Sequence, residues 1–297
     1  MVTGLVLLCI AAGTWLQYRR VNGGLTNEDL VARLPVKDAI HVVINVQALR
    51  QAGVLDMLAG SRTAEETDYK NFVRDSSFNY REDLDAIAAA FQKSDQFFLL
   101  RGRFDWPQLR KYALAKGGSC KNGYCTLGTD GNRYVSFFPV SPSTLALAIS
   151  EDPQAAYALI GPVRRPSDLD LPKHPFLVVI PSSILQGVDL PAGTRAFASA
   201  VKDAEQIVLG LDSAPVGFQA ILRASCRNEK QAESMAAQLT AITETLLRYI
   251  QREKHTPNPQ DLSGVLTSGT FRWQDRMVLG QWPIQRGFLE SVAEGKY

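Results

Sequence analysis

The sequence predicts an α+β fold made of two tandem repeats, each a mainly antiparallel sheet with helices on one face, preceded by an N-terminal membrane helix. Three observations lead to this prediction. An apolar run opens the chain, a two-strand pattern in residues 83–104 recurs in residues 203–226, and the elements that flank the two copies follow one order. The predicted segments are a membrane anchor or uncleaved signal (1–20), a connector (21–35), the first repeat (36–161), a linker (162–173) and the second repeat (174–297).

The composition is that of an ordinary globular protein. A length of 297 residues suits two domains, and 45% apolar with 21% charged residues excludes a disordered or collagenous chain. The formal net charge is only +2, and the chain contains no long run of Lys and Arg. The charge pattern therefore predicts no nucleic-acid partner.

Residues 2–18 carry no charged side chain and would be about 25 Å long as a helix. This is slightly short for a membrane span, so an uncleaved signal peptide and a buried helix remain alternatives. Arg19 and Arg20 follow the run as they would at a membrane exit, and the positive-inside rule by itself would place them in the cytoplasm. We expect a retained anchor in contact with the lipid bilayer through Leu5, Val6, Leu7, Leu8, Ile10, Trp15 and Leu16.

A short connector helix near Thr26 precedes the first repeat, which begins with a β-branched strand over residues 39–46 and a helix over residues 47–58. A polar excursion over residues 61–80 precedes the hairpin of residues 83–104. Asp105 as a cap and Pro107 in the first turn then predict a helix that ends near Lys116.

Residues 119–127 carry the most specific local pattern, because Asn122-Gly123 is the preferred two-residue type I′ turn. This turn places Cys120 opposite Cys125 with Cα atoms about 4.5 Å apart, where a disulfide fits. A disulfide would indicate an oxidising compartment. A reduced pair is the alternative, and a metal site lacks the further ligands that tetrahedral coordination needs.

The rest of the chain follows the same element order. A hairpin over residues 133–150, a helix over 151–160 and a proline-rich linker lead to a strand at 176–180 and a helix at 182–188. After a short helix at 196–202, the second hairpin and a long helix capped by Asn228, residues 270–282 form a last hairpin and 283–292 a closing helix. The two hairpins align Ile87 with Ile207, Phe91 with Leu211, Leu100 with Leu222, and Arg101 with Arg223.

Candidate catalytic residues are few. The sequence contains no phosphate-binding glycine loop, dinucleotide fingerprint, HExxH or GxSxG motif, so no enzyme activity, cofactor or metal is predicted. His41 and His174 each precede the first strand of a repeat at similar positions, which favours a structural role over a catalytic one. Ser199 and Lys202 form a Ser-x-x-Lys, the spacing of serine-lysine acyl enzymes, but the accompanying motifs are missing.

Two further sets of residues bear on binding. Arg101 and Arg223 are candidate ligand-binding residues if an anion lies in a cleft between the repeats, although structural ion pairs also explain them. Phe97-Phe98 and Phe137-Phe138 are adjacent pairs on strands, so their side chains point to opposite faces of a sheet. The face away from the helices then needs cover from the other repeat or from a partner.

Several short motifs carry a family resemblance over roughly residues 35–295: Leu99–Gly102 with its echo at 221–224, the Cys-Lys-Asn-Gly-Tyr-Cys turn, and the Gly-Arg-Phe-Asp of residues 102–105. With the anchor, the chain resembles uncharacterised bacterial membrane-anchored extracytoplasmic proteins with a duplicated α+β domain. The second repeat departs from the pattern, with Ala-Ser-Cys-Arg at residues 224–227. The resemblance implies a periplasmic or extracytoplasmic location and no established activity.

The sequence thus supports three hypotheses. The leading one is a non-enzymatic, membrane-tethered accessory or scaffold subunit that docks on a membrane or envelope protein complex. The first alternative is an extracytoplasmic ligand-binding module that uses the cleft between the repeats. The second alternative is a serine-lysine hydrolase acting through Ser199 and Lys202.

Overall fold

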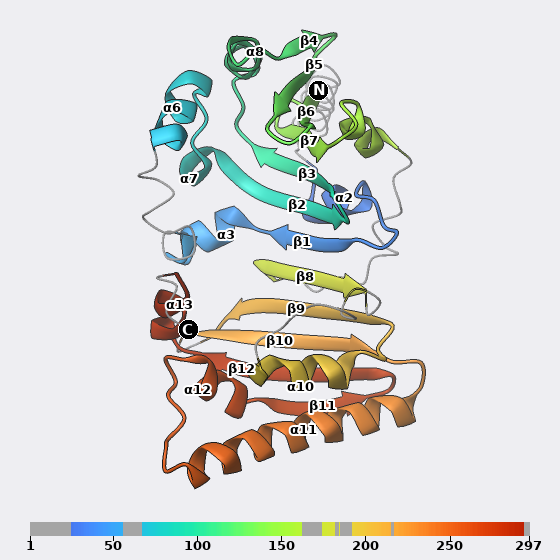
Figure 1. Ribbon diagram of the computed structural model, residues 1–297, viewed down its shortest axis with the longest axis vertical. Coiled ribbons are helices and arrows are strands. Elements are labelled where there is room, and N and C mark those ends of the chain that lie inside the picture. The colour runs from blue at the N-terminus through green and yellow to red at the C-terminus, as the bar shows by residue number, and fades with distance from the viewer. Residues whose placement is uncertain are drawn as a thin grey trace, which may run out of the picture.

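The computed structural model contains one antiparallel sheet of twelve strands with helices packed against it (Figure 1). It describes residues 25–55, 67–161, 174–181, 184, 192–214 and 217–293. The expected anchor (1–20), the linker (162–173) and the helix at 182–188, save residue 184, lie outside these ranges. Within them, no helix is both long and apolar enough to cross a membrane.

The strands alternate with helices along the chain. The strands are β1 (Ile40–Ile44), β2 (Leu84–Gln92), β3 (Asp95–Gly102), β4 (Ser119–Lys121), β5 (Tyr124–Thr129), β6 (Arg133–Ser141), β7 (Thr144–Ser150), β8 (Phe176–Pro181), β9 (Gln206–Ser213), β10 (Phe218–Ser225), β11 (Thr270–Gln274) and β12 (Met277–Ile284). The helices are α2 (Asn27–Ala32), α3 (Val46–Gln51), α6 (Thr67–Ser76), α7 (Tyr80–Asp83), α8 (Trp106–Ala115), the 3₁₀ helix η1 (Ala155–Ile160), α10 (Ala192–Val201), α11 (Glu229–Arg252), α12 (Leu262–Thr267) and α13 (Arg286–Ala293).

The sheet is continuous across the predicted boundary between the repeats. Its order is β11-β12-β10-β9-β8-β1-β2-β3-β7-β6-β5-β4, so β1 and β8 are hydrogen-bonded neighbours at the centre. The pair is antiparallel, with Val42 opposite Val178. The expectation of a separate sheet in each repeat was therefore wrong. Both strands carry apolar side chains on both faces. In a separate sheet each strand would have an unpaired edge, and here the backbone groups of that edge form hydrogen bonds with the other strand.

The predicted hairpins and helix caps are confirmed. Strands β2 and β3 pair across Lys93-Ser94, and β9 pairs with β10. The Asp105 side chain accepts from the N–H of Gln108 at the start of α8, and Asn228 does the same for Gln231 in α11. The predicted helix at 151–160 is instead the short 3₁₀ helix η1.

Helices cover both faces of the half formed by β1–β7, which corrects the expectation of helices on one face. Helices α2 and η1 pack on one face, where Leu30 and Leu159 belong to the same buried cluster as Phe97 and Leu99. We call this the α2 face. The capping box of Thr26 and Asp29 starts α2, so the predicted connector supplies part of the cover.

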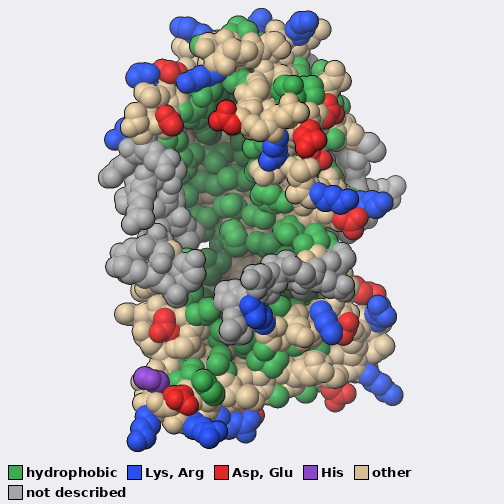
Figure 2. All heavy atoms as spheres, viewed as in Figure 1, with side chains coloured by type: hydrophobic (Ala, Val, Ile, Leu, Met, Phe, Trp, Pro, Cys, Tyr) green, Lys and Arg blue, Asp and Glu red, His purple; other side chains and the backbone are tan. Residues whose placement is uncertain are grey.

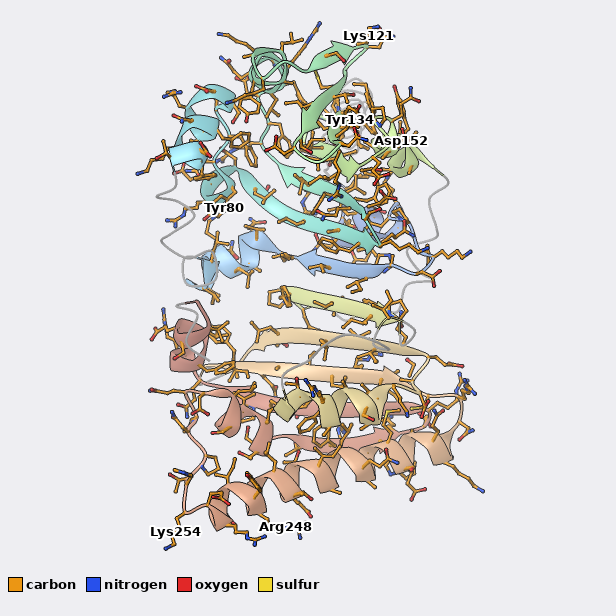
Figure 3. All side chains as sticks on the ribbon, viewed as in Figure 1. Tyr80, Lys121, Tyr134, Asp152, Arg248 and Lys254 are labelled. Carbon is orange, nitrogen blue, oxygen red and sulfur yellow. A yellow bond between two sulfur atoms is a disulfide. The ribbon has the colours of Figure 1, made fainter. Side chains whose placement is uncertain are left out.

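The opposite face, which we call the α11 face, carries α3 and α8 over the first half and α10, α11, α12 and α13 over the second. Apolar residues of α11 such as Met235 and Leu239 are buried against the sheet, while Arg248 points away from it (Figure 3). The adjacent pair Phe137 and Phe138 divides between the two faces, as predicted, and each is 8% exposed. Helices of the same half therefore cover both rings.

Candidate functional site

The two arginines predicted to bind an anion are far apart. Arg101 lies on β3 and Arg223 on β10, so five inter-strand steps of about 4.8 Å, about 24 Å in all, separate them. The Nη1 atom of Arg101 donates to the Leu25 carbonyl oxygen at 2.7 Å. Arg223 lines a shallow pocket of 450 Å³ together with Glu205 and Asp275. One small anion cannot contact both guanidinium groups, and this part of the cleft hypothesis is corrected.

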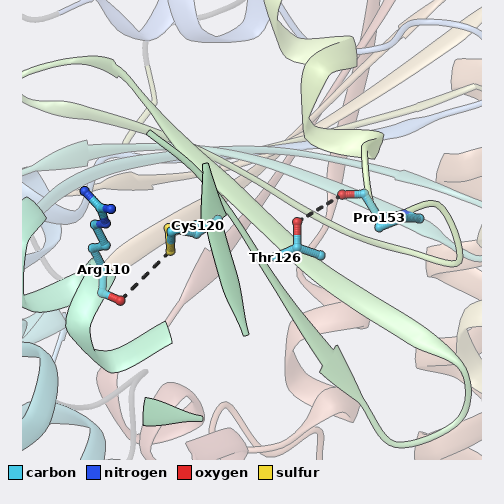
Figure 4. Close-up of a disulfide and its surroundings, with 5 residues drawn as sticks. Arg110, Cys120, Thr126 and Pro153 are labelled. Carbon is cyan, nitrogen blue, oxygen red and sulfur yellow. Dashed lines mark hydrogen bonds between the residues drawn. A yellow bond between two sulfur atoms is a disulfide. The ribbon is translucent and has the colours of Figure 1, made fainter. Parts of the chain in front are cut away.

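The predicted cross-strand cysteine pair forms a disulfide, shown in Figure 4. Cys120 and Cys125 are opposite residues of β4 and β5 with Cα atoms 4.1 Å apart. The turn residues Asn122 and Gly123 have φ of 50° and 81°, as the type I′ prediction requires. Cys125 is buried against α8, so the disulfide fixes the edge of the sheet.

The remaining catalytic candidates are not arranged as a catalytic site. Ser199 lies on α10 and Lys202 just beyond its end, and both are exposed. A lysine base in an acyl enzyme is usually desolvated, and Lys202 is not. His41 lies inside β1 rather than before it, with Nε2 2.7 Å from the Pro35 carbonyl oxygen. In the described ranges, no cluster of three or more His, Cys, Asp or Glu side chains is placed to hold a metal.

Two cavities, neither of them predicted, are the main functional features. The first, which we call the sheet hollow, has a volume of 820 Å³ and lies between α6, α8 and the α11 face of β3, β5, β6 and β7. Figure 2 shows green apolar side chains gathered in this concave part of the surface. The apolar lining consists of Phe72, Phe78, Leu100, Phe104, Leu109, Tyr112, Leu127, Val135, Phe137, Leu145 and Leu147.

The wall of the sheet hollow is aromatic. The ring of Phe72 meets that of Tyr112 edge-on at 5.2 Å, and Phe78 stacks on Phe104 at 5.2 Å. Such ring pairs hold their side chains in fixed positions. The rim is polar and contains Asp68, Asn71, Lys116, Thr129 and Asp130. The floor is therefore apolar, and charges of both signs surround its opening.

Hydrogen bonds and an ion pair hold the segment between α6 and β2, which contributes Phe78 to the wall of the sheet hollow. The Tyr69 hydroxyl donates to Asn79 Oδ1 at 3.0 Å, and burial raises the pKa of Tyr69, which keeps that donor protonated. Arg103 forms an ion pair with Asp83 at 2.9 Å. Gly102 is required at this contact, because a Cβ there would lie 2.1 Å from the Asp83 carbonyl oxygen.

Partly exposed apolar side chains continue from the sheet hollow across the middle of the α11 face. We call them the central strip: Ile40, Val42, Phe91, Phe98, Val178 and Leu209. Leu209 is 39% exposed, although its neighbour Val208 on the α2 face is 6% exposed. The α2 face of the sheet centre is thus filled by packed side chains, whereas the α11 face retains apolar surface in contact with water.

The second cavity, which we call the seam cavity, has a volume of 470 Å³ and lies where the two halves meet. The end of β1, the start of β8 and the end of β9 form it, together with α2 and α3. The N–H of Asn45 donates to the Pro175 carbonyl oxygen at 2.7 Å, which ties the two halves together beside it. His174 Nδ1 lies 3.3 Å from Asp212 Oδ2, within ion-pair distance but without the alignment of a hydrogen bond.

The fold defines a class of α+β proteins with one long antiparallel sheet. No family model and no curated protein matches the sequence. Among solved structures, crystal form I of TP0453, a protein of the bacterium Treponema, aligns with 92% of this chain and 99% of that chain at a TM-score of 0.50 and 13% identity. Crystal forms IV and III of TP0453 align at TM-scores of 0.46, with 11% and 10% identity over 90% of this chain and 96% of those chains. At such identities the likeness shows the fold alone.

Proposed function

We propose that this chain is a non-enzymatic, membrane-tethered docking subunit that holds an amphipathic helix of a membrane or envelope protein against the α11 face. The observation that carries the proposal is the 820 Å³ sheet hollow, whose apolar floor opens to solvent. Soluble proteins rarely leave a contiguous apolar patch of this kind unless it binds a partner.

The dimensions favour a helix over a small molecule. The sheet hollow and the central strip together extend from β5 to β9, seven inter-strand steps and about 34 Å. That distance is the length of about 22 helical residues, and a helix with its side chains is about 10 Å wide. Charges of both signs at the rim, Lys116 with Asp68 and Asp130, suit the polar edge of an amphipathic helix.

The same proposal places the globular part outside the cytoplasm. The disulfide between Cys120 and Cys125 supports an oxidising compartment. The apolar residues of the segment 1–20 supply the tether in this proposal. A tether restricts the search for a partner in the same membrane and raises its effective concentration at the docking surface.

We also propose that residues 36–161 and 174–297 are tandem repeats related by an approximate twofold axis. In support, the strand orders β1-β2-β3-β7-β6 and β8-β9-β10-β12-β11 correspond. Ile44 pairs with Ile87 as Ile180 pairs with Ile207. These equivalences make the β1–β8 ladder symmetric about its Val42–Val178 pair.

The register also changes one part of the hairpin alignment. Leu100 is the partner of Ile87, whereas Ala224 is the partner of Ile207. In ladder position Leu100 therefore corresponds to Ala224 rather than Leu222, and Arg101 corresponds to Ser225. The second hairpin is longer than the first between these paired positions, since Ile207 and Ala224 are 17 residues apart in the sequence (224 − 207) and Ile87 and Leu100 are 13 apart (100 − 87).

The docking function can be tested by purifying the chain from its native membranes in mild detergent. We expect the wild type to elute as a stoichiometric complex with one membrane or envelope protein. Leu147→Glu, in the floor of the sheet hollow, should release the partner because a carboxylate would be buried without a counter-ion.

Leu279→Glu is the matched control, since Leu279 is also partly buried but lies on the α2 face of β12. It should retain the complex. Circular dichroism spectra must show that both variants are folded. A wild type that elutes alone, or equal loss of the partner in both variants, would contradict the proposal.

A further inference from the structure

We infer that the seam cavity is a binding site for a small organic cation, an ammonium group attached to an apolar body. This inference uses residues other than those of the sheet hollow, so it stands independently of the docking proposal. The volume of the seam cavity, 470 Å³, lies within the range of about 300–1,000 Å³ that is usual for small-molecule sites.

The electrostatics of the seam cavity select the charge of the ligand. Two carboxylates, Glu28 and Asp212, line it, and none of the described lining residues is Lys or Arg. An anion would therefore lose its water shell beside like charges. A cation would gain charge-assisted hydrogen bonds from the same carboxylates.

The buried polar atoms of the seam cavity favour a ligand that donates hydrogen bonds. Asn27 Oδ1 is buried and accepts no hydrogen bond, which is costly for a polar atom. His174 Nδ1 is likewise buried without a hydrogen bond, although it lies close to Asp212. An alkylammonium has three N–H donors and no acceptor, and it can supply the donor that Asn27 lacks while it pairs with the Glu28 carboxylate.

The other lining residues of the seam cavity are mostly apolar and favour a ligand with an apolar part. The wall is formed by Val31, Val43, Leu49, Val54, Leu177 and Leu211. These residues come from α2, β1, α3 and the turn after it, β8 and β9, so the wall exists only when both halves of the sheet are joined. An alkyl chain or a ring of moderate size would bury its surface against them.

The test is calorimetric titration of the full-length chain in detergent with three probes of equal chain length: hexylammonium, hexan-1-ol and hexanoate. We expect saturable binding of hexylammonium to one site, at least tenfold weaker binding of hexan-1-ol, and no binding of hexanoate. Equal affinity for hexylammonium and hexan-1-ol, or binding of hexanoate, would overturn the inference. Lack of binding by all three probes would overturn it as well.

Substitutions test whether hexylammonium binds in the seam cavity. Asp212→Asn and Glu28→Gln should each weaken hexylammonium binding about tenfold or more, and 47% of the Asp212 side chain is exposed, so the first variant should fold. Asp130→Asn, at the rim of the sheet hollow, is the matched control and should bind as the wild type does. Unchanged affinity in both seam variants would refute the assignment. Leu147→Glu should retain hexylammonium binding even if it loses the partner, which separates the two proposals.

Discussion

Substitution of Leu177 tests whether the two halves fold as one unit. Leu177 lies on β8, is 2% exposed and packs in one cluster with residues of α2, β1, β2 and β3. Leu177→Ala removes buried carbon atoms and leaves a cavity, which costs about 3 kcal/mol in a rigid core. With an unfolding entropy of roughly 0.6 kcal/mol/K for a chain of this length, the midpoint of thermal unfolding should fall by roughly 5 °C.

The assay is urea unfolding followed by fluorescence from tryptophans in separate halves. Trp106 lies on α8 in the first half, while Trp273 and Trp282 lie on β11 and β12 in the second. One background contains Trp106→Phe, the other contains Trp273→Phe with Trp282→Phe, and both contain Trp15→Phe. Because β1 and β8 are paired, we expect coincident transitions that shift together in the Leu177→Ala variant.

Leu209→Ala is the matched control. It removes the same carbon atoms from the neighbouring strand β9, but Leu209 is 39% exposed and lies on the α11 face. Its cost should stay below about 1 kcal/mol. Two separate transitions, a shift seen only by the second-half tryptophans, or equal costs for the two substitutions would refute the reasoning.

Three further predictions concern single features. Gly102→Ala should destabilise the chain by about 2–3 kcal/mol in urea unfolding because its methyl would overlap a carbonyl oxygen, whereas Gly128→Ala, with open space around it, should change stability little. Burial raises the pKa of the Cys226 thiol, so iodoacetamide should label Cys226 only after unfolding. Because the folded thiol keeps its proton to higher pH than the unfolded thiol, stability should fall as pH rises above about 8.5, and Cys226→Ser should reduce that dependence. Replacing both cysteines of the β4–β5 disulfide by serine should cost at most about 2 kcal/mol, since the closed loop is short, and dithiothreitol should have the same effect on the wild type.

Local elements could be predicted because short stretches of sequence determine them. Asn122-Gly123 needs only its own two positive φ angles to set the β4–β5 register and bring the cysteines together. Asp105 and Asn228 cap α8 and α11 through hydrogen bonds that reach three residues along the chain. Such signals depend on no distant part of the fold.

The pairing of β1 with β8 could not be predicted because strands pair through backbone hydrogen bonds, which do not depend on the identity of the side chains. Strand β1 reads Ile-His-Val-Val-Ile and β8 reads Phe-Leu-Val-Val-Ile-Pro, and either is apolar enough for the centre or the covered edge of a sheet. Two separate sheets, one in each repeat, would be equally consistent with these strand sequences. They differ from the continuous sheet only because each would leave an apolar edge strand exposed to solvent.

The cavities were missed for a related reason. The lining of the sheet hollow comes from residues spread between Asp68 and Leu147, and that of the seam cavity from Asn27 to Phe218. No spacing in the sequence brings these residues together. The similar residues that flank Arg101 and Arg223 suggest a shared site, but similar sequences do not bring distant strands together.

The distribution of small side chains explains why the two faces of the first half differ. Ala86, Ala88, Ala90, Ala146 and Ala148 all point to the α2 face and have no exposed surface. Small residues let α2 and η1 approach the sheet closely, so the chain itself fills that face. The same strands place larger side chains on the α11 face, the Ile, Leu and Phe of the central strip and the sheet hollow, and many of them remain half-exposed. A sheet that needed only its own helices for stability would gain from small or polar residues there, so the excess of large apolar side chains supports the α11 face as the docking surface.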